Sequence, residues 1–353
     1  MALLNQNNLV QLPCPDYLSA FAESRIGGRS ENQDSFGAKQ TPMGYLVTVC
    51  DGMGGGPGGK TASMLAVKEI IAGVMDGSSD DIPYNVIIKA IRRANMAMIE
   101  YTHNHPELAG MGSTCTVLLI NENSAYVAHV GDSRVYQLRG KQKIFRTFDH
   151  SMVFDLVKQK VITEEQARLA AQSNVITRAL GVKYDVEVDC IELAYLKGDR
   201  FLLSTDGIHG ALPEIKLLEL ATNRVVSLGA VTDDIATIID GEGRNSGGGH
   251  DNLTLALIET NINSKLKSKI SMRTKCIIFG LITICLLSTG MNIYLASRSP
   301  YASKDVERMV DSLEHRIDSL QSKNKKLFKQ HERDSISLKK IAKQIEEIKK
   351  NKR

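Results

Sequence analysis

The chain of 353 residues lacks the cysteine spacing that marks a disulfide scaffold or a zinc site. Its six cysteines form no CxxC pair, and none stands at metal-ligand spacing from a histidine. Two of them, Cys276 and Cys285, fall inside an apolar run. Reduced, structural thiols are therefore expected.

The N-terminus lacks the basic start and long apolar run of a secretory signal, and residues 1–262 lack a net positive charge. Of the net charge of +4, residues 263–353 contribute +12, so residues 1–262 carry −8. This acidic part argues against nucleic acid as a partner and suits a carboxylate-rich site for cations. We expect it to be made and kept in the cytoplasm.

Between about Phe21 and Glu259, short β-rich runs alternate with longer helical patterns. Around residues 114–139 the expected strands follow one another directly, with the turn sequence NENS at residues 121–124. Such spacing is typical of antiparallel hairpins. A purely parallel, doubly wound sheet is therefore disfavoured.

An uncharged run of 21 residues occupies positions 276–296. At ~1.5 Å per residue it reaches the ~30 Å of a bilayer core, which predicts one transmembrane helix. Basic residues crowd its amino side between Lys265 and Lys275, so residues 1–275 are expected in the cytoplasm of a single-pass membrane protein. A buried core helix is the alternative, because four polar residues dilute the run.

The tail, residues 297–353, repeats apolar side chains every seven residues, as at Leu313, Leu320 and Leu327. The repeat predicts a coiled coil outside the cytoplasm and a possible homo-dimer through it. Polar residues such as Asn324 interrupt its middle, and a single solvated helix is the alternative.

A glycine-rich stretch, Gly54 to Thr61, matches the phosphate-binding loop G-x-x-x-x-G-K-[ST] between a strand-like and a helix-like segment. A nucleotide hydrolase would place Lys60 over a β-phosphate and Thr61 on Mg²⁺, with Asp206 at a second strand end. That hypothesis leaves several isolated aspartates unexplained.

Five aspartates stand at expected strand ends or tight turns, each beside glycine, asparagine or serine. They are Asp34, Asp51, Asp132, Asp206 and Asp251. Taken singly, each is typical of a turn or a cap. Taken together, they would supply the oxygen ligands that Mg²⁺ or Mn²⁺ requires.

Eight short motifs, in this order, resemble those of the metal-dependent (type 2C) serine/threonine protein phosphatases. They are RxxNQD (29–34), DGMGG (51–55), GST (112–114), GDSR (131–134), DHS (149–151), NVITRALG (174–181), STDG (204–207) and DNLT (251–254). Two of them, DGMGG and NVITRALG, have the sequence typical of bacterial members. The resemblance covers about residues 20–260.

This resemblance implies an α+β fold, a four-layer α-β-β-α sandwich of two antiparallel sheets flanked by helices. With the features above, it divides the chain into five segments. They are an N-terminal extension (1–20), a phosphatase domain (21–262), a basic juxtamembrane linker (263–275), the transmembrane helix (276–296) and the coiled-coil tail (297–353).

The resemblance also implies a metal site that holds two Mn²⁺ or Mg²⁺ ions. Asp51 would bridge the ions, Asp34 and the Gly52 carbonyl would ligate one of them, and Asp206 and Asp251 would complete the other. Two such ions would lower the pKa of a shared water, and the resulting hydroxide would attack the phosphorus of phosphoserine or phosphothreonine in line.

Two further residues are implied beside this pair of ions. Asp132 matches a residue that helps to hold a third, weaker metal in bacterial members. Arg29 matches the guanidinium that grips the substrate phosphate, and its planar fork fits phosphate oxygens.

The sequence departs from the family pattern at two positions near these ligands. Met53 stands where animal members have a histidine, so the general acid would be water, His150 or another group. Gln33 stands where many relatives have a glutamate, which removes a charge and predicts weaker metal binding.

By the same resemblance, residues 151–180 would form a mobile flap beside the site. The alternative is an ordinary covering helix pair.

The sequence therefore predicts a membrane-anchored cytoplasmic phosphatase that acts on phosphorylated proteins modified by Ser/Thr kinases. One alternative is a receptor or scaffold whose phosphatase-like domain binds phosphoproteins without efficient turnover. The nucleotide hydrolase is the other.

Overall fold

The computed structural model describes residues 9–54, 58–170 and 175–266, and it divides the chain into two compact units at Ser268. All described residues belong to the first unit. The predicted transmembrane helix (276–296) and coiled coil (297–353) lie outside them. Within the described ranges, no helix combines the length and the apolar character needed to cross a bilayer.

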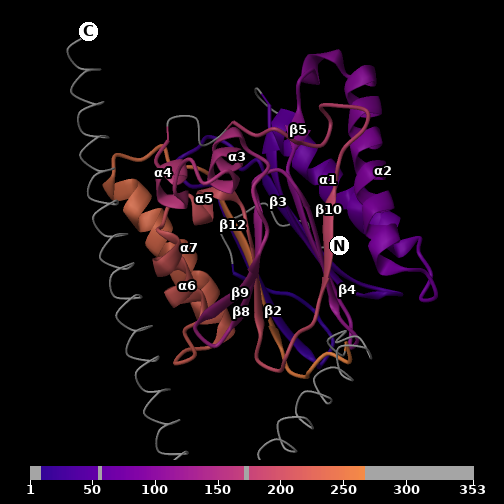
Figure 1. The fold of residues 1–353 in the computed structure, drawn as a ribbon. Coiled ribbons are helices and arrows are strands. Elements are labelled where there is room, and N and C mark those ends of the chain that lie inside the picture. Colours follow the sequence, from indigo (N-terminus) through magenta and orange to yellow (C-terminus); the bar gives the residue numbers. More distant parts are fainter. Residues whose placement is uncertain (1–8, 55–57, 171–174, 267–353) are drawn as a thin grey trace, which may run out of the picture. The chain divides into compact units, whose positions relative to one another are not determined.

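Two antiparallel six-stranded sheets form the centre of the domain (Figure 1). The first contains, in spatial order, β1 (Val10–Gln11), β2 (Leu18–Arg25), β12 (Leu253–Thr260), β11 (Arg200–Ser204), β8 (Arg134–Arg139) and β9 (Gln142–Arg146). The second contains β10 (Asp189–Leu193), β7 (Ala125–Val130), β6 (Cys115–Ile120), β4 (Gly44–Met53) and β3 (Asp34–Thr41), with β5 (Gly112–Ser113) paired to β4. β2 starts before residue 21, where the domain was expected to begin.

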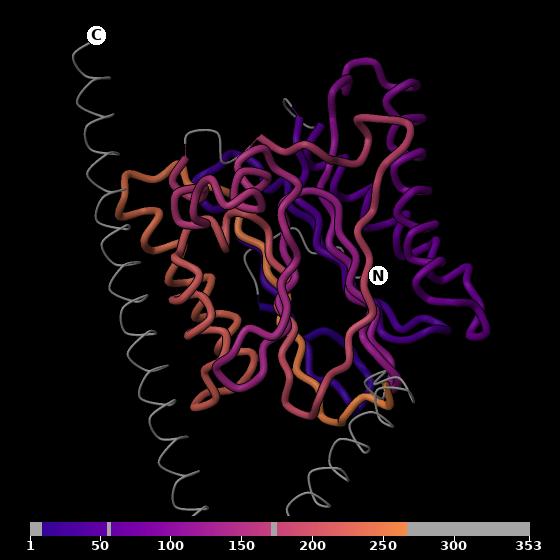
Figure 2. Tube along the Cα trace, viewed as in Figure 1, coloured from indigo at the N-terminus to yellow at the C-terminus, as the bar shows by residue number. Residues whose placement is uncertain are grey.

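Helices cover the outer face of each sheet (Figures 1 and 2). The long helices α1 (Gly58–Met75) and α2 (Pro83–Asn104) pack on the second sheet through a common core. The helices α6 (Glu214–Ala221) and α7 (Leu228–Asn245) cover the first. A third core joins the two sheets. The predicted α-β-β-α sandwich is therefore confirmed for the described domain.

Local sequence explains the main elements. In α1 the buried residues Ala62, Ala66, Ile70 and Val74 recur every four positions, which places them on one helical face. β4 lies between two strands and is covered on both faces, so its residues up to Cys50 form an almost continuous apolar run.

The predicted hairpin is the pair β6–β7, which turns through residues 121–124. Asn121 N donates to the Ser124 carbonyl at 3.0 Å and closes this turn. The end of the described chain lies against the same turn, because Leu266 N donates to the Asn123 carbonyl at 2.6 Å.

Short helices form a separate layer over one end of the sandwich. They are α3 (Met152–Lys158), α4 (Glu164–Arg168) and α5 (Asp206–His209). α3 and α4 share a small apolar cluster of their own that includes Val153, Phe154 and Ala167. The side chain of Ser151 caps α3, and Thr163 begins α4 with a capping box.

Candidate metal and phosphate site

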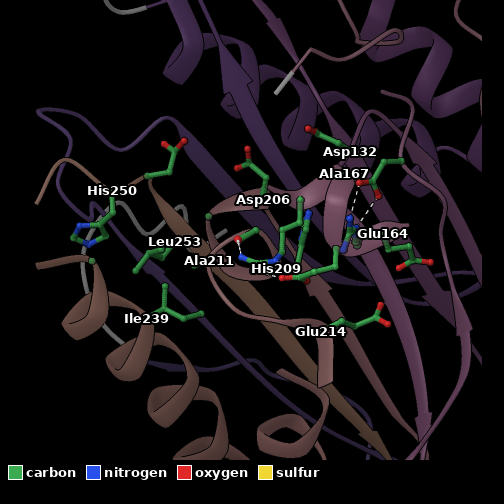
Figure 3. A pocket seen from close by; sticks show the side chains of 18 of the residues that line it. Asp132, Glu164, Ala167, Asp206, His209, Ala211, Glu214, Ile239, His250 and Leu253 are labelled. Atoms are coloured by element: carbon green, nitrogen blue, oxygen red, sulfur yellow. Dashed lines mark hydrogen bonds and ion pairs between the residues drawn. The ribbon is translucent and has the colours of Figure 1, made fainter. Parts of the chain in front are cut away.

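The five aspartates singled out from the sequence meet at one end of the sandwich. Asp34 opens β3 and stands opposite Asp51 of β4 in the strand register. Asp206 begins α5 two residues after the end of β11, and Asp251 lies two residues before the start of β12. Asp132 lies in the turn between β7 and β8. Figure 3 shows Asp132 and Asp206 on the same side of a pocket.

Burial and mutual repulsion disfavour the charged form of four carboxyl groups, those of Asp34, Asp51, Asp132 and Asp206. Burial, and then the charges of Asp206 and Asp251, raise the pKa of Asp34 to about 7. Burial and Asp251 raise the pKa of Asp206 to about 6. The pKa values of Asp51 and Asp132 are also raised well above the usual range, by burial and by neighbouring aspartates.

Such a cluster fits divalent cations. The five aspartates offer hard oxygen donors, two of them (Asp34 and Asp132) are buried, and their charges repel one another. The guanidinium of Arg29 lies at the border, where its Nη2 contacts Asp251 Oδ2 at 3.0 Å. Its side chain is 52% exposed, so it can reach a substrate phosphate from the open side.

A buried hydrogen-bond network fixes Asp34 between the two sheets. Thr205 Oγ1 donates to Asp34 Oδ2 at 2.9 Å, and the Asp34 amide donates to Asn32 Oδ1 at 3.1 Å. Asn32 in turn donates to Ser24 Oγ, which bonds Thr254 Oγ1 at 2.7 Å. Three of the sequence motifs thus supply polar residues that orient one carboxylate.

Close packing beside Asp51 explains two glycines, Gly52 of the DGMGG motif and Gly59 of α1. The Asp51 amide donates to Thr114 Oγ1 at 2.9 Å. A Cβ on Gly52 would lie 1.9 Å from the Gly59 carbonyl oxygen, and a Cβ on Gly59 would lie 2.7 Å from the Gly52 oxygen. Both positions need glycine because the first turn of α1 passes directly over β4.

The GDSR and DHS motifs form a buried ion pair beside Asp132. Arg134 donates through Nε and Nη2 to the two carboxylate oxygens of Asp149, both at 2.7 Å. The guanidinium also lies over the Phe154 ring. This pair ties the turn of Asp132 to the segment that leads into α3.

His209 is a site residue that the sequence reasoning did not identify. It lies buried beside the aspartates, bonds Ser204 Oγ at 3.0 Å and hydrogen-bonds the Asp132 backbone. Burial, and then Arg134 and Arg146, lower the pKa of His209 well below its usual value, so the ring is neutral. Its position three residues after Asp206 was the only available signal.

One group of three potential ligands lies apart from the aspartates, and its geometry argues against a metal. Among the described residues, His129, His150 and Asp189 bring ligand atoms within 4.8 Å of one another. His150 Nδ1 accepts the Gly131 N–H at 3.2 Å, and its Nε2 is already contacted by Arg178 Nη1 at 3.2 Å and by Asp189 Oδ2 at 3.3 Å. Arg178 already supplies a cation, 3.0 Å from Asp189.

The contacts of His150 also bear on whether it is the general acid, a role that the sequence did not assign to one group. Burial, His129 and Arg178 lower the pKa of His150 to about 4, and Nε2 lies 3.3 Å from Asp189 Oδ2. His150 is thus neutral and bonded on both ring nitrogens. It braces the Gly131 turn, since its own amide also donates to the Gly131 carbonyl at 2.9 Å.

Known proteins resemble this chain in both sequence and fold. Residues 23–237 match the family model described as protein phosphatase 2C. The serine/threonine phosphatase stp of Listeria innocua is 32% identical over 242 residues, which cover 68% of this chain and 90% of that protein.

Two solved structures share the fold. The serine/threonine phosphatase Stp1 of Staphylococcus aureus superposes with a TM-score of 0.63 at 27% identity, covering 71% of this chain and 98% of that one. The catalytic domain of the serine/threonine protein phosphatase PstP, in complex with two manganese ions, gives a TM-score of 0.57 at 30% identity and covers 69% and 97%. The chain therefore belongs to the protein phosphatase 2C family and is a protein serine/threonine phosphatase.

Proposed function

We propose that the aspartate cluster holds two Mn²⁺ or Mg²⁺ ions, with a third, weaker site at Asp132, and that the enzyme hydrolyses phosphoserine and phosphothreonine on proteins. The single observation that carries this proposal is the convergence of buried carboxylates with raised pKa at one end of the sandwich. The two manganese ions in the related PstP structure support the proposed number of two ions.

Each residue has a defined task in this proposal. Asp51, Asp34 and the Gly52 carbonyl, together with Asp206 and Asp251, would hold the two ions. When bound, the cations lower the pKa of a shared water and neutralise charge on the phosphoryl oxygens.

The protein's own groups then orient the substrate. Arg29 exchanges its contact with Asp251 for the phosphate oxygens, and its fork fits two of them. Thr205 keeps Asp34 in its ligating orientation. Because His150 is bonded on both ring nitrogens, we propose that solvent water protonates the leaving oxygen of the serine or threonine side chain, which gives the free hydroxyl group.

Removal of divalent metal tests this function. We expect the full chain, treated with chelator and desalted, to lose hydrolysis of a phosphothreonine peptide and to regain it when Mn²⁺ is added. ATP, offered under the same conditions, should show no comparable turnover, because Gly52 and Gly59 serve the packing of α1 on β4. Full peptide hydrolysis without divalent metal would contradict the proposal.

We also propose that residues 276–296 anchor this enzyme in the cell membrane, with the phosphatase domain in the cytoplasm and the tail outside. The support is the uncharged run, the basic residues that precede it and the heptad repeat that follows it. Self-association of the tail would give a homo-dimer.

Protease treatment of intact cells tests this topology. External protease should remove epitopes from residues 297–353 and leave the phosphatase domain whole, and cross-linking should yield dimers only when the tail is present. Recovery of the full chain in the soluble fraction would rule the anchor out.

A further inference from the structure

His250, the residue before the proposed metal ligand Asp251, is fixed to helix α7 through its ring. Its Nε2 lies 2.9 Å from Asp240 Oδ1. Burial raises the pKa of Asp240, but the hydrogen bond from His250 and the charge of Arg244 outweigh burial and hold this pKa below its usual value. The carboxylate is therefore charged and only accepts, so His250 Nε2 donates the hydrogen bond. Figure 3 shows the ring at the border of the pocket, on the side of Ile239 of α7.

The His250 ring also lies directly against the backbone of α7. A Cβ on Gly243 would stand 2.3 Å from Cγ of the ring and 2.5 Å from its Nδ1. Carbon atoms in van der Waals contact need about 3.5–4.0 Å, so only glycine leaves room for the ring here. A Cβ on Gly241, two residues earlier in the same helix, would meet no atom of the described residues within 4 Å. The place of the ring therefore depends on Gly243 in particular.

The backbone of His250 connects this anchor to the loop that carries Arg29. The Gly28 amide donates to the His250 carbonyl at 2.9 Å, and a Cβ on Gly27 would lie 2.0 Å from the Asp251 carbonyl oxygen. The two loops are therefore packed backbone to backbone. Arg29 Nη2 in turn contacts Asp251 Oδ2 at 3.0 Å. A displacement of His250 would move both the proposed metal ligand and the guanidinium.

The chain between α7 and His250 brings no side chain to this junction. Gly247, Gly248 and Gly249 have φ angles of +103°, +76° and +75°, a left-handed backbone that suits glycine. Side-chain packing of this loop on α7 therefore begins at His250, whose side chain is only 14% exposed.

We propose that His250 is a positioning residue, which holds Asp251 toward its metal ion and Arg29 toward the substrate phosphate. Its hydrogen bond to Asp240 and its place against Gly243 transmit the fixed geometry of α7 to both groups. This inference rests on the proposed function, because it requires a cation and a phosphate at these residues.

Replacement of the ring tests the hydrogen bond. His250→Leu keeps a bulky side chain but has no donor for Asp240. When the metal-free full chain is titrated with Mn²⁺ in a calorimeter, the Kd of one strong site should rise on the order of tenfold, as is typical when a group that orients a metal ligand is lost. At saturating Mn²⁺ the KM for a phosphothreonine peptide should rise while kcat changes less, since Arg29 grips the phosphate already in the bound substrate. His250→Gln can still donate from its amide nitrogen, and it should recover most of both losses.

A second pair of variants moves the ring without altering it. Gly243→Ala places a methyl group where the ring stands, so it should reproduce the weaker Mn²⁺ binding and the raised KM of His250→Leu. Gly241→Ala is the matched control in the same helix and should change neither quantity. Because alanine favours helix over glycine, the metal-free Gly241→Ala protein should melt no lower than the unchanged protein.

The outcomes separate this inference from the proposed function. An unchanged protein without metal-dependent peptide hydrolysis would overturn both. If the unchanged protein is active and His250→Leu binds Mn²⁺ and peptide equally well, the positioning role fails and the phosphatase stands. Equal losses in His250→Gln and His250→Leu would show that the hydrogen bond to Asp240 is not the cause. Unaltered Mn²⁺ binding in Gly243→Ala would overturn the role of the ring's place on α7.

Discussion

Asp206→Asn is expected to lower kcat/KM for a phosphothreonine peptide on the order of a thousandfold. The amide keeps the shape of the side chain but removes a charge that a divalent cation needs, and metal ions contribute several kcal/mol to stabilising such transition states. The measurement is peptide hydrolysis at saturating Mn²⁺. Calorimetric titration of Mn²⁺ should show the loss of one strong site.

A second readout of the same variant does not depend on activity. In the metal-free protein, burial and Asp251 raise the pKa of Asp206 to about 6, so ionisation of this group opposes folding. The folded state favours the neutral carboxyl group of Asp206. Its contribution to the free energy of unfolding is therefore present at low pH and is lost as the pH rises through about 6. At pH 8 without metal, Asp206→Asn should therefore melt no lower than the unchanged protein.

Lys60→Ala is the matched control for this experiment. Lys60 lies in the first turn of α1 and would be essential in a phosphate-binding loop for nucleotides. We expect peptide hydrolysis to be unchanged in this variant. ATP turnover that depends on Lys60 would replace the phosphatase with a nucleotide hydrolase, and unimpaired peptide hydrolysis in Asp206→Asn would contradict the assigned metal ligands.

The aspartates could be found from sequence because their signal is local. Asp51 follows an apolar strand and precedes glycine, and Asp206 and Asp251 stand in similar settings. The antiparallel hairpin β6–β7 was predictable for the same reason, since both strands and the turn are contiguous.

The partners of these aspartates could not be found in this way. Thr205 is 171 residues from Asp34, and the pairing of β12 with β2 and β11, together with the packing of the two sheets, brings their segments together. His209 reaches Asp132 through the pairing of β11 with β8. The pocket beside these aspartates is lined from α3, α4, α5, α6, α7, β8 and β12, so no single stretch of sequence carries its pattern.

Asp149→Ala is expected to cost about 3–5 kcal/mol in the free energy of unfolding. The change leaves the guanidinium of Arg134 buried without the carboxylate that binds it through two hydrogen bonds. The measurement is urea unfolding of residues 1–268, which form a compact unit of their own. The m-value should stay constant if only stability changes.

Two further variants separate the loss of this ion pair from a general effect of shortening a side chain. Asp76→Ala removes an exposed partner of Arg93 and should cost less than about 1 kcal/mol. The double variant Arg134→Met, Asp149→Leu removes both charges and should recover much of the loss, because a buried pair is costly to desolvate and apolar side chains are not. If the double variant is as unstable as the single one, shape rather than charge pairing holds the turn of Asp132, and the role assigned to this ion pair fails.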